Sequence, residues 1–289
     1  MKIIFKFFFK IAYYLKYYLK VSWIKLKIFK MPEQHPQFGS DYKPALRAIL
    51  RASELSINNR FYTIGSVLGA LQAKFCGYKN ITLIEFGVAS GKGMRSLLKI
   101  SKIIKEEMNI SVSVVGFDNR EGLPDPLDYR DHPEIWDKEQ FAMAENFENL
   151  DNYVKSLDGK LVIGDVKETL DKFELNDQVL AFASIDVDYY SSTIPIINWL
   201  KNLNTANTLP ASVLYFDDVL KLWTYSKYAG EELAIENFNN LSVDRKIELK
   251  SKELKLYAMH NFSHPIRTGE KKPNIKLNLF VDYLNKFHP

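Results

Sequence analysis

Acidic side chains recur at five points of the sequence where a short apolar run ends. The segments that follow these runs read EFGVASGKG, GFDNREGLP, GDVKETL, IDVDYYSST and FDDV. In a parallel sheet the carboxyl ends of the strands share one edge, and ligands bind beyond that edge. We therefore expect the five acidic segments to meet at one site, where carboxylates can bind hydroxyl groups, a cation or a hard metal ion.

The glycine turn after the first run, in IEFGVASGKG, narrows the choice of ligand. A phosphate-binding P-loop requires G-x-x-x-x-G-K-[ST], but here Gly87 and Gly91 are one residue too close, and Gly93 replaces the hydroxyl residue. The dinucleotide pattern G-x-G-x-x-G is also absent. Glu85 would repel a pyrophosphate, whereas it suits a cationic ligand. The pattern favours S-adenosylmethionine; the alternative is that the glycines only allow a helix to pack closely on a strand.

Elements that position these residues are predicted from the spacing of apolar side chains. We expect strands over Ile81–Phe86, Val112–Phe117, Lys160–Ile163, Leu180–Val187, Val213–Phe216, Lys246–Leu249 and Lys255–His260. We expect helices over Tyr42–Leu55, Thr63–Phe75, Gly93–Glu107, Ala142–Leu157, Thr193–Leu203 and Gly230–Leu241. This alternation predicts an α/β, Rossmann-like fold: a doubly wound, mostly parallel sheet of seven strands with helices on both faces.

Composition agrees with a globular protein. The 289 residues are 46% hydrophobic and 26% charged, enough to bury a full core. The single cysteine, Cys76, cannot form an internal disulfide, so we expect a cytoplasmic protein.

The first 30 residues differ from the rest in charge. They contain eight lysines and no acidic residue, which leaves 31 basic and 35 acidic residues beyond them, a net charge of −4. On a helical wheel most of these lysines share one broad face, and the aromatic residues lie mostly outside it. We interpret residues 1–30 as a basic amphipathic arm, residues 31–62 as a linker with a leading helix, and residues 63–289 as the main domain.

The arm is typical of a helix that lies on an anionic membrane surface. Lysines interrupt its apolar runs well short of a transmembrane span, and no cleavage site of a signal peptide follows. We expect a protein peripheral to the inner membrane face. The alternative is that the aromatic face packs on the protein's own body or on another subunit of a homodimer. Nucleic acid is not expected, because the body adds no basic groove.

From about Thr63 onward, the sequence resembles class I S-adenosylmethionine-dependent methyltransferases. It is most similar to sugar O-methyltransferases of the macrocin O-methyltransferase type and their relatives in bacterial surface-polysaccharide clusters. IEFGVASGKG resembles the first motif of that family, GFDNREGLP the acidic second motif and GDVKETL the adenine-side loop. DVDYYSST followed by FDDV is similar to the metal-site pair, and GEELAIENFN to the helix after it.

The resemblance implies roles for individual residues. The methionine part of the cofactor would be held by Glu85, Gly87, Ser90 and Gly91. Asp118 would bind the ribose hydroxyls, and Asp165 would lie near the adenine amino group. A magnesium ion would be bound by Asp186, Asp217 and Asp218, with Asp186 also accepting the proton of the substrate. The alternative for the FDD segment is a solvated turn whose acids cap a helix.

The implied activity is methylation of a hydroxyl group, on a sugar of a bacterial surface polysaccharide or glycolipid precursor, assisted by a divalent metal. Two other functions stay open. One is a non-catalytic, membrane-associated binding protein with a methyltransferase fold. The other is a metal-independent N- or O-methyltransferase of a small molecule.

Two further segments have candidate roles. Gly122–Phe141 is a long, turn-rich insertion that we interpret as a lid over the cofactor and the acceptor, with Tyr129, Arg130 and Trp136 as substrate contacts. His260 and His264 follow the last predicted strand, either near the rim of the site or on an ordinary surface turn.

Overall fold

A mixed sheet organises the part of the chain that the computed structural model describes, which comprises residues 20–30, 42–55, 59–143, 147–219, 223–274, 284 and 286–288. The seven strands are β1 (Asn80–Phe86), β2 (Ser111–Asp118), β3 (Lys160–Ile163), β4 (Val179–Ile185), β5 (Ala211–Phe216), β6 (Arg245–Ser251) and β7 (Leu256–Asn261). Their order is β3-β2-β1-β4-β5-β7-β6. β1 to β5 are parallel, whereas β7 runs antiparallel to both β5 and β6. The predicted fold class is confirmed.

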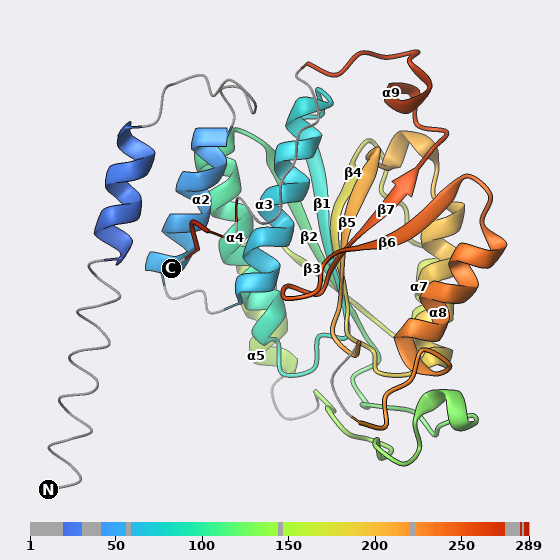
Figure 1. The fold of residues 1–289 in the computed structure, drawn as a ribbon. Helices are drawn as coiled ribbons and strands as arrows, with labels where there is room; N and C mark the ends of the chain where they lie inside the picture. The colour runs from blue at the N-terminus through green and yellow to red at the C-terminus, as the bar shows by residue number, and fades with distance from the viewer. Residues whose placement is uncertain are drawn as a thin grey trace, which may run out of the picture.

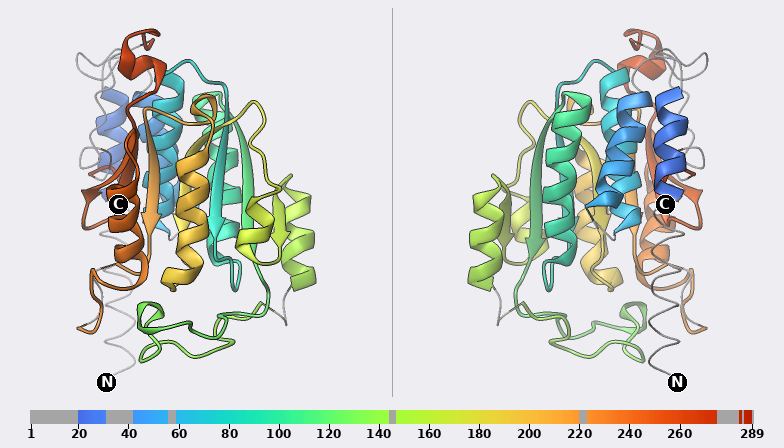
Figure 2. Two further views of the ribbon diagram at one scale, coloured as in Figure 1. Left: turned by 90° about the vertical axis from the view of Figure 1, so that its right-hand side faces the viewer. Right: turned by 90° about the vertical axis from the view of Figure 1, so that its left-hand side faces the viewer.

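Helices cover both faces of the sheet (Figures 1 and 2). One face carries α2 (Tyr42–Glu54), α3 (Arg60–Phe75), α4 (Lys92–Met108) and α5 (Phe147–Ser156), and the other carries α6 (Val166–Leu170), α7 (Tyr190–Asn202) and α8 (Gly230–Leu241). The short elements are α9 (Pro265–Thr268) and the 3₁₀ turns η1 (Tyr129–Asp131) and η2 (Thr205–Asn207).

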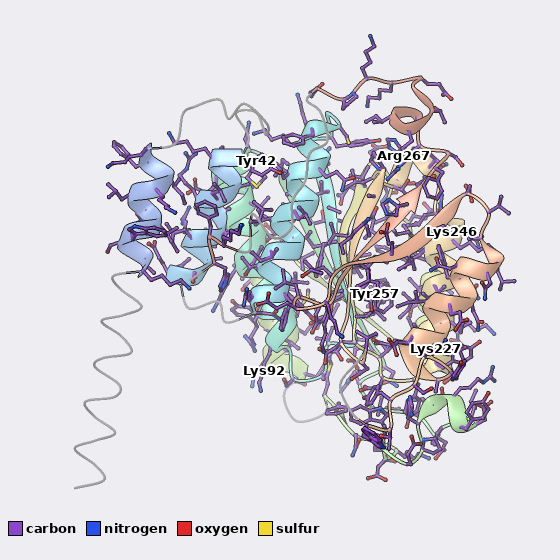
Figure 3. All side chains as sticks on the ribbon, in the orientation of Figure 1. Tyr42, Lys92, Lys227, Lys246, Tyr257 and Arg267 are labelled. Atoms are coloured by element: carbon purple, nitrogen blue, oxygen red, sulfur yellow. The ribbon has the colours of Figure 1, made fainter. Side chains whose placement is uncertain are left out.

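The layering follows from the residue patterns. β1 and β4 are buried along almost their whole length because helices cover both of their sides. α4 is amphipathic and buries one stripe, whereas α3 is buried almost all round because it lies between the sheet and α2. Tyr42, labelled in Figure 3, joins α2 to α3, with its ring 6.1 Å from that of Phe75.

Several predicted boundaries differ from the structure; the helix predicted from Thr63, for example, begins at Arg60. The strand predicted over Leu180–Val187 ends at Ile185, so Asp186 is the first residue beyond it. The helix predicted from Thr193 begins at Tyr190, because the Tyr189 carbonyl accepts hydrogen bonds from both the backbone and the hydroxyl of Thr193, at 3.0 and 2.7 Å. The helix predicted from Ala142 is described only from Phe147, and the two described residues at its predicted start are not helical.

Residues 20–30 form a helix, here named the arm helix, that packs outside α2 at the left of Figure 1. Val21, Ile24 and Ile28 are buried in the same core as α2 and α3. Lys25 forms an ion pair of 2.6 Å with Glu54 of α2. The arm therefore docks on the body through aliphatic side chains over this part. Residues 1–19 and most of the predicted linker lie outside the described residues, and none of the described helices is long and apolar enough to cross a bilayer.

Candidate active site

A cavity of about 650 Å³ opens at the carboxyl ends of the parallel strands. Its lining includes residues of the segment drawn in green at the bottom of Figures 1 and 2, such as Leu123 and Trp136. Six of the residues predicted for the site line this cavity: Gly87, Asp118, Asp165, Asp186, Asp217 and Asp218. Segments up to 130 residues apart in the sequence thus meet at one place, as expected for the carboxyl edge of a parallel sheet.

The three predicted metal ligands form a compact cluster. One carboxylate oxygen from each of Asp186, Asp217 and Asp218 lies within 4.8 Å of the other two. The register explains this, because Ile185 pairs with Phe216, and the next residue on each strand is an aspartate. Three hard oxygen donors at this separation fit a magnesium ion. The segment NLNTANTLPAS, which lengthens the spacing from Asp186 to Asp217, leads into β5 from its opposite end and leaves the cluster intact.

Neither aspartate of the FDD segment caps a described helix. The next described helix, α8, begins at Gly230, and its N-cap Ala229 provides no side-chain hydrogen bond. Asp217 accepts a hydrogen bond from the Tyr215 hydroxyl and lies 3.2 Å from the Lys255 ammonium. The helix-capping alternative is not supported among the described residues.

Two further carboxylates lie at the cluster and were not predicted. Asp188 lines the cavity, and burial, together with the neighbouring Asp218, raises the pKa of its carboxyl to about 9. Glu231 is fully buried on α8, and one of its oxygens accepts the backbone N–H of Asp218 at 2.9 Å. Its other oxygen has no hydrogen-bond partner among the described residues.

These two acids could be foreseen to different degrees. Asp188 stands two residues beyond Asp186 in DVDYY. Side chains two residues apart in an extended segment point to the same side, so this spacing could have indicated that Asp188 joins the site. Glu231 lies in the first turn of α8, in GEELAIENFN, where an acid is ordinary. Its proximity to Asp218 depends on how α8 docks, which the local sequence does not indicate.

Gly87 is required by the close approach of β1 and β4. Its φ is +83°, and a Cβ atom there would lie 1.8 Å from the Asp186 carbonyl oxygen. Gly91 and Gly93 instead make room for neighbouring side chains, since Cβ atoms there would meet Leu150 at 2.5 Å and Glu85 at 1.7 Å. Gly91 and Gly93 thus serve close packing, as the alternative in the sequence analysis proposed. Gly87, by contrast, lines the cavity.

Asp118 holds the glycine turn in place. One of its carboxylate oxygens accepts the N–H groups of Val88 and Ala89, both at 2.8 Å, and the other accepts the N–H of Arg120 at 2.7 Å. The oxygen that accepts the Arg120 N–H has a second lone pair, so one acceptor position of Asp118 remains for a ligand. Its predicted contact with ribose remains a prediction.

Glu85 lies beneath the glycine turn and is not among the residues that line the cavity. It accepts a hydrogen bond of 2.8 Å from the Tyr62 hydroxyl, which itself accepts one of 2.7 Å from Ser184. The second oxygen of Glu85 has no partner among the described residues, and burial raises the pKa of the carboxyl well above its usual range. Ser90 and Gly91 also lie outside the lining residues.

Asp165 caps α6, accepting the backbone N–H of Lys167 at 2.7 Å, and it lines the cavity beside Gly164. Asp165 follows β3 by two residues, and β3 pairs with β2, so Asp165 and Asp118 stand at the ends of neighbouring strands. Its predicted proximity to an adenine ring stays a prediction.

The segment Gly122–Phe141 lies across the cavity and is tied to the body. Asp131 is buried and accepts the backbone N–H and the hydroxyl of Ser191, at 2.8 and 2.9 Å. Trp136 lines the cavity, with its ring 5.7 Å from that of Phe141. The other two predicted contacts do not line it: Tyr129 is 70% exposed, and Arg130 pairs with Asp128 at 2.7 Å.

His260 and His264 lie at the opposite edge of the sheet, because β7 runs antiparallel and His260 pairs with Ala211 at the start of β5. Of the two alternatives predicted for these histidines, a position near the rim of the site is excluded. His264 caps α9 and contacts the Tyr78 hydroxyl at 3.2 Å, and burial lowers its pKa to about 4. His260 contacts Glu248 at 2.8 Å.

A known structure shares this fold, although no protein-family model and no curated protein matches the sequence. The calicheamicin methyltransferase CalS11 superposes with a TM-score of 0.50 at 19% identity, over 86% of this chain and 93% of that one. The O-methyltransferase NovP gives a TM-score of 0.48 at 18% identity, over 70% of this chain and 79% of that one. An O-methyltransferase from Bacillus cereus, in complex with SAH, gives 0.37 at 16% identity, over 75% and 90%.

The first of these comparisons shows that the chain has the fold of a methyltransferase. The architecture and the position of the cavity agree with the fold predicted from the motifs.

Proposed function

We propose that the protein transfers a methyl group from S-adenosylmethionine to a hydroxyl group, on a sugar of a bacterial surface polysaccharide or glycolipid precursor, with the help of a divalent metal. The observation that carries this proposal is the convergence of Asp186, Asp217 and Asp218 in the same cavity as the glycine turn. A cofactor position and a metal position would then share one space, as methyl transfer to a hydroxyl requires.

The cofactor half of the proposal rests on the strand ends of β1, β2 and β3. The cavity has the size of a small-molecule site. Gly87 keeps it open to a ligand that approaches the backbone, and Asp118 and Asp165 offer acceptors for hydroxyl and amino groups. One oxygen of buried Glu85, beneath the turn, has no hydrogen-bond partner among the described residues, and a cationic ligand above the turn would stabilise the ionised form of this carboxyl. S-adenosylmethionine would supply an electrophilic methyl group on a sulfonium.

The acceptor half rests on the acidic cluster. A divalent ion held by the three aspartates would lower the pKa of a coordinated hydroxyl. In the transfer, the hydroxyl oxygen forms a bond to the methyl carbon, the bond from that carbon to sulfur breaks, and the hydroxyl proton passes to a carboxylate. We propose Asp186 as the carboxylate that accepts this proton. Asp188, two residues further along the chain, also lines the cavity.

A sugar is favoured as the acceptor by the lid. Trp136 and Phe141 line the same cavity as the acids, and their aromatic surface suits the apolar face of a pyranose ring. The resemblance of DVDYYSST and FDDV to sugar O-methyltransferases supports the same choice.

Transfer of a labelled methyl group to a panel of nucleotide-activated and lipid-linked sugars tests the proposal. We expect product only with divalent metal, and we expect Asp186→Asn to abolish turnover while cofactor affinity changes little. Asp177→Asn, at an exposed position away from the cavity, is the matched control and should stay fully active. Full activity in excess chelator would overturn the metal part. Labelling of amines alone would overturn the hydroxyl part.

A further inference from the structure

The arm helix presents two different faces. Val21, Ile24 and Ile28 point into the core against α2, as described above. Trp23, Leu26 and Phe29 are 56%, 51% and 81% exposed, and Phe29 also borders a groove beside α2. These three follow one another at intervals of three residues, so they form one stripe along the outer side of the helix. Packing on the body therefore does not use the large apolar side chains of this helix.

Positive charge accompanies this stripe. Lys20, Lys27 and Lys30 are exposed on the same outer half of the helix, and the Lys27 ammonium lies 3.7 Å from the centre of the Trp23 ring. No acidic residue occurs in residues 1–30, and residues 1–19 add four more lysines. The rest of the chain, by contrast, carries a net charge of −4.

An aromatic stripe bordered by lysines matches the interface of an anionic bilayer. Rings enter the boundary between headgroups and acyl chains, while the ammonium groups remain at the level of the lipid phosphates. The rest of the chain has a net negative charge, so the attraction to such a surface is concentrated on the arm side of the molecule. In Figure 1 the arm helix is the outermost described helix on its side, and the exposed fractions of the three side chains show that solvent reaches the stripe.

We propose that the outer face of the arm helix, formed by Trp23, Leu26, Phe29 and the flanking Lys20, Lys27 and Lys30, is a docking surface for an anionic lipid bilayer. The aliphatic face of the same helix fixes it to α2. Docking would therefore hold the whole catalytic body at the membrane in one orientation, rather than on a flexible tether. This inference does not depend on the proposed methyl transfer.

Co-sedimentation of the full chain with vesicles tests the surface. The probe is an equal mixture of phosphatidylglycerol and phosphatidylcholine, with phosphatidylcholine alone as the reference. Trp23→Ser with Phe29→Ser should weaken binding to the anionic vesicles at least about tenfold, because two rings lose their burial in the interface. Leu241→Ser with Val243→Ser, two residues that are likewise exposed but lie at the end of α8, should leave it unchanged.

Two charge variants distinguish the effect of the lysines on the arm helix from the effect of the net charge of the protein on vesicle binding. Lys27→Glu with Lys30→Glu should abolish binding at moderate salt, whereas Lys252→Glu with Lys272→Glu, which changes the net charge equally, should reduce it only slightly. Circular dichroism and thermal unfolding confirm that each variant folds.

Direct contact is measured with an environment-sensitive dye. The dye is attached to Phe29→Cys or to Val243→Cys, with Cys76→Ala in both proteins. Its emission should shift to the blue with anionic vesicles only at position 29.

Binding that stays within about twofold in the Trp23 and Phe29 variant would overturn the proposal, as would equal loss in both charge variants. A dimer that this variant converts to a monomer, from a parent that ignores vesicles, would also overturn it and assign the face to a second copy of the chain.

Discussion

At the scale of single residues, the site combines carboxylates that bind ligands with carboxylates that hold the backbone. Asp118 holds the backbone by accepting hydrogen bonds from three N–H groups, and it also lines the cavity. Such a residue fixes the geometry of the turn before any ligand arrives. Its loss should therefore affect binding both directly and through the turn.

Asp118→Ala tests this double role. We expect the affinity for S-adenosylhomocysteine to fall by about 1.5–3 kcal/mol, the usual loss for a charged hydrogen-bonding partner. Calorimetric titration measures it, with Asp177→Ala as a control at an exposed position. An unchanged affinity would show that Asp118 contributes only to the turn and that the turn does not contact the ligand.

Asp188 should make the metal-free protein less stable as pH rises. Its pKa of about 9 in the folded protein exceeds its ordinary value of 3.8, so the folded state holds a proton that the unfolded state loses between these values. The stabilising contribution is thus complete below about pH 4 and disappears as pH approaches 9. Asp188→Asn should raise the free energy of unfolding at pH 8 in chelator by about 1–3 kcal/mol.

Urea denaturation from pH 5 to pH 8 measures this difference. The gap between wild type and Asp188→Asn should widen with pH. A constant gap would mean that the carboxyl is ionised in the folded protein throughout.

The sequence predicted which residues stand at the strand ends, because the position of an acid after an apolar run is a local property. It did not predict what those acids contact. The partners of Glu85 and Asp218 are Tyr62 on α3 and Glu231 on α8, and both pairings depend on how distant helices dock.

At the scale of elements, the position of the site follows from the register of the parallel strands. β1 and β4 approach so closely at their ends that only glycine fits at position 87. Alternating apolar runs and helical segments were sufficient to predict all seven strands, because the central strands are buried between helices, and β3 and β6 at the sheet edges still contain apolar residues. The first residues of the helices were harder to predict from the sequence. In α7, for example, the start depends on hydrogen bonds that the Tyr189 carbonyl accepts from Thr193.

Gly87→Ala should destabilise the fold more than an equivalent change elsewhere. Gly269 has a similar positive φ, +85° against +83°, but a Cβ atom there would meet nothing within 4 Å. Gly269→Ala therefore measures the backbone strain alone, about 1–2 kcal/mol. Gly87→Ala should exceed it by about 1–3 kcal/mol because the added methyl collides with the Asp186 carbonyl.

Thermal unfolding of the two variants gives the comparison. Equal losses would indicate that the ends of β1 and β4 separate easily, and the close approach would then not define the cavity.

At the scale of the whole molecule, a strongly basic helix is joined to a mildly acidic body through an aliphatic contact. The charge contrast was readable from composition. The contact was not, because Val21, Ile24 and Ile28 are a minor part of an arm dominated by aromatic residues and lysines. The described part of the arm thus belongs to the fold of the body.

Ile24→Ala should lower the free energy of unfolding by about 2–4 kcal/mol, because the side chain is fully buried against α2. Leu26→Ala, on the outer face, should change it by less than about 0.5 kcal/mol. Urea denaturation of the full chain measures both. Similar small losses would mean that the arm helix does not pack on α2 in solution.

The central claim is that the cavity at the strand ends binds S-adenosylmethionine. Calorimetric titration of the full chain with S-adenosylhomocysteine tests it without knowledge of the acceptor. We predict one site per chain with an affinity in the low micromolar range or tighter. Absence of binding to the folded wild-type protein, with and without magnesium, would contradict the account.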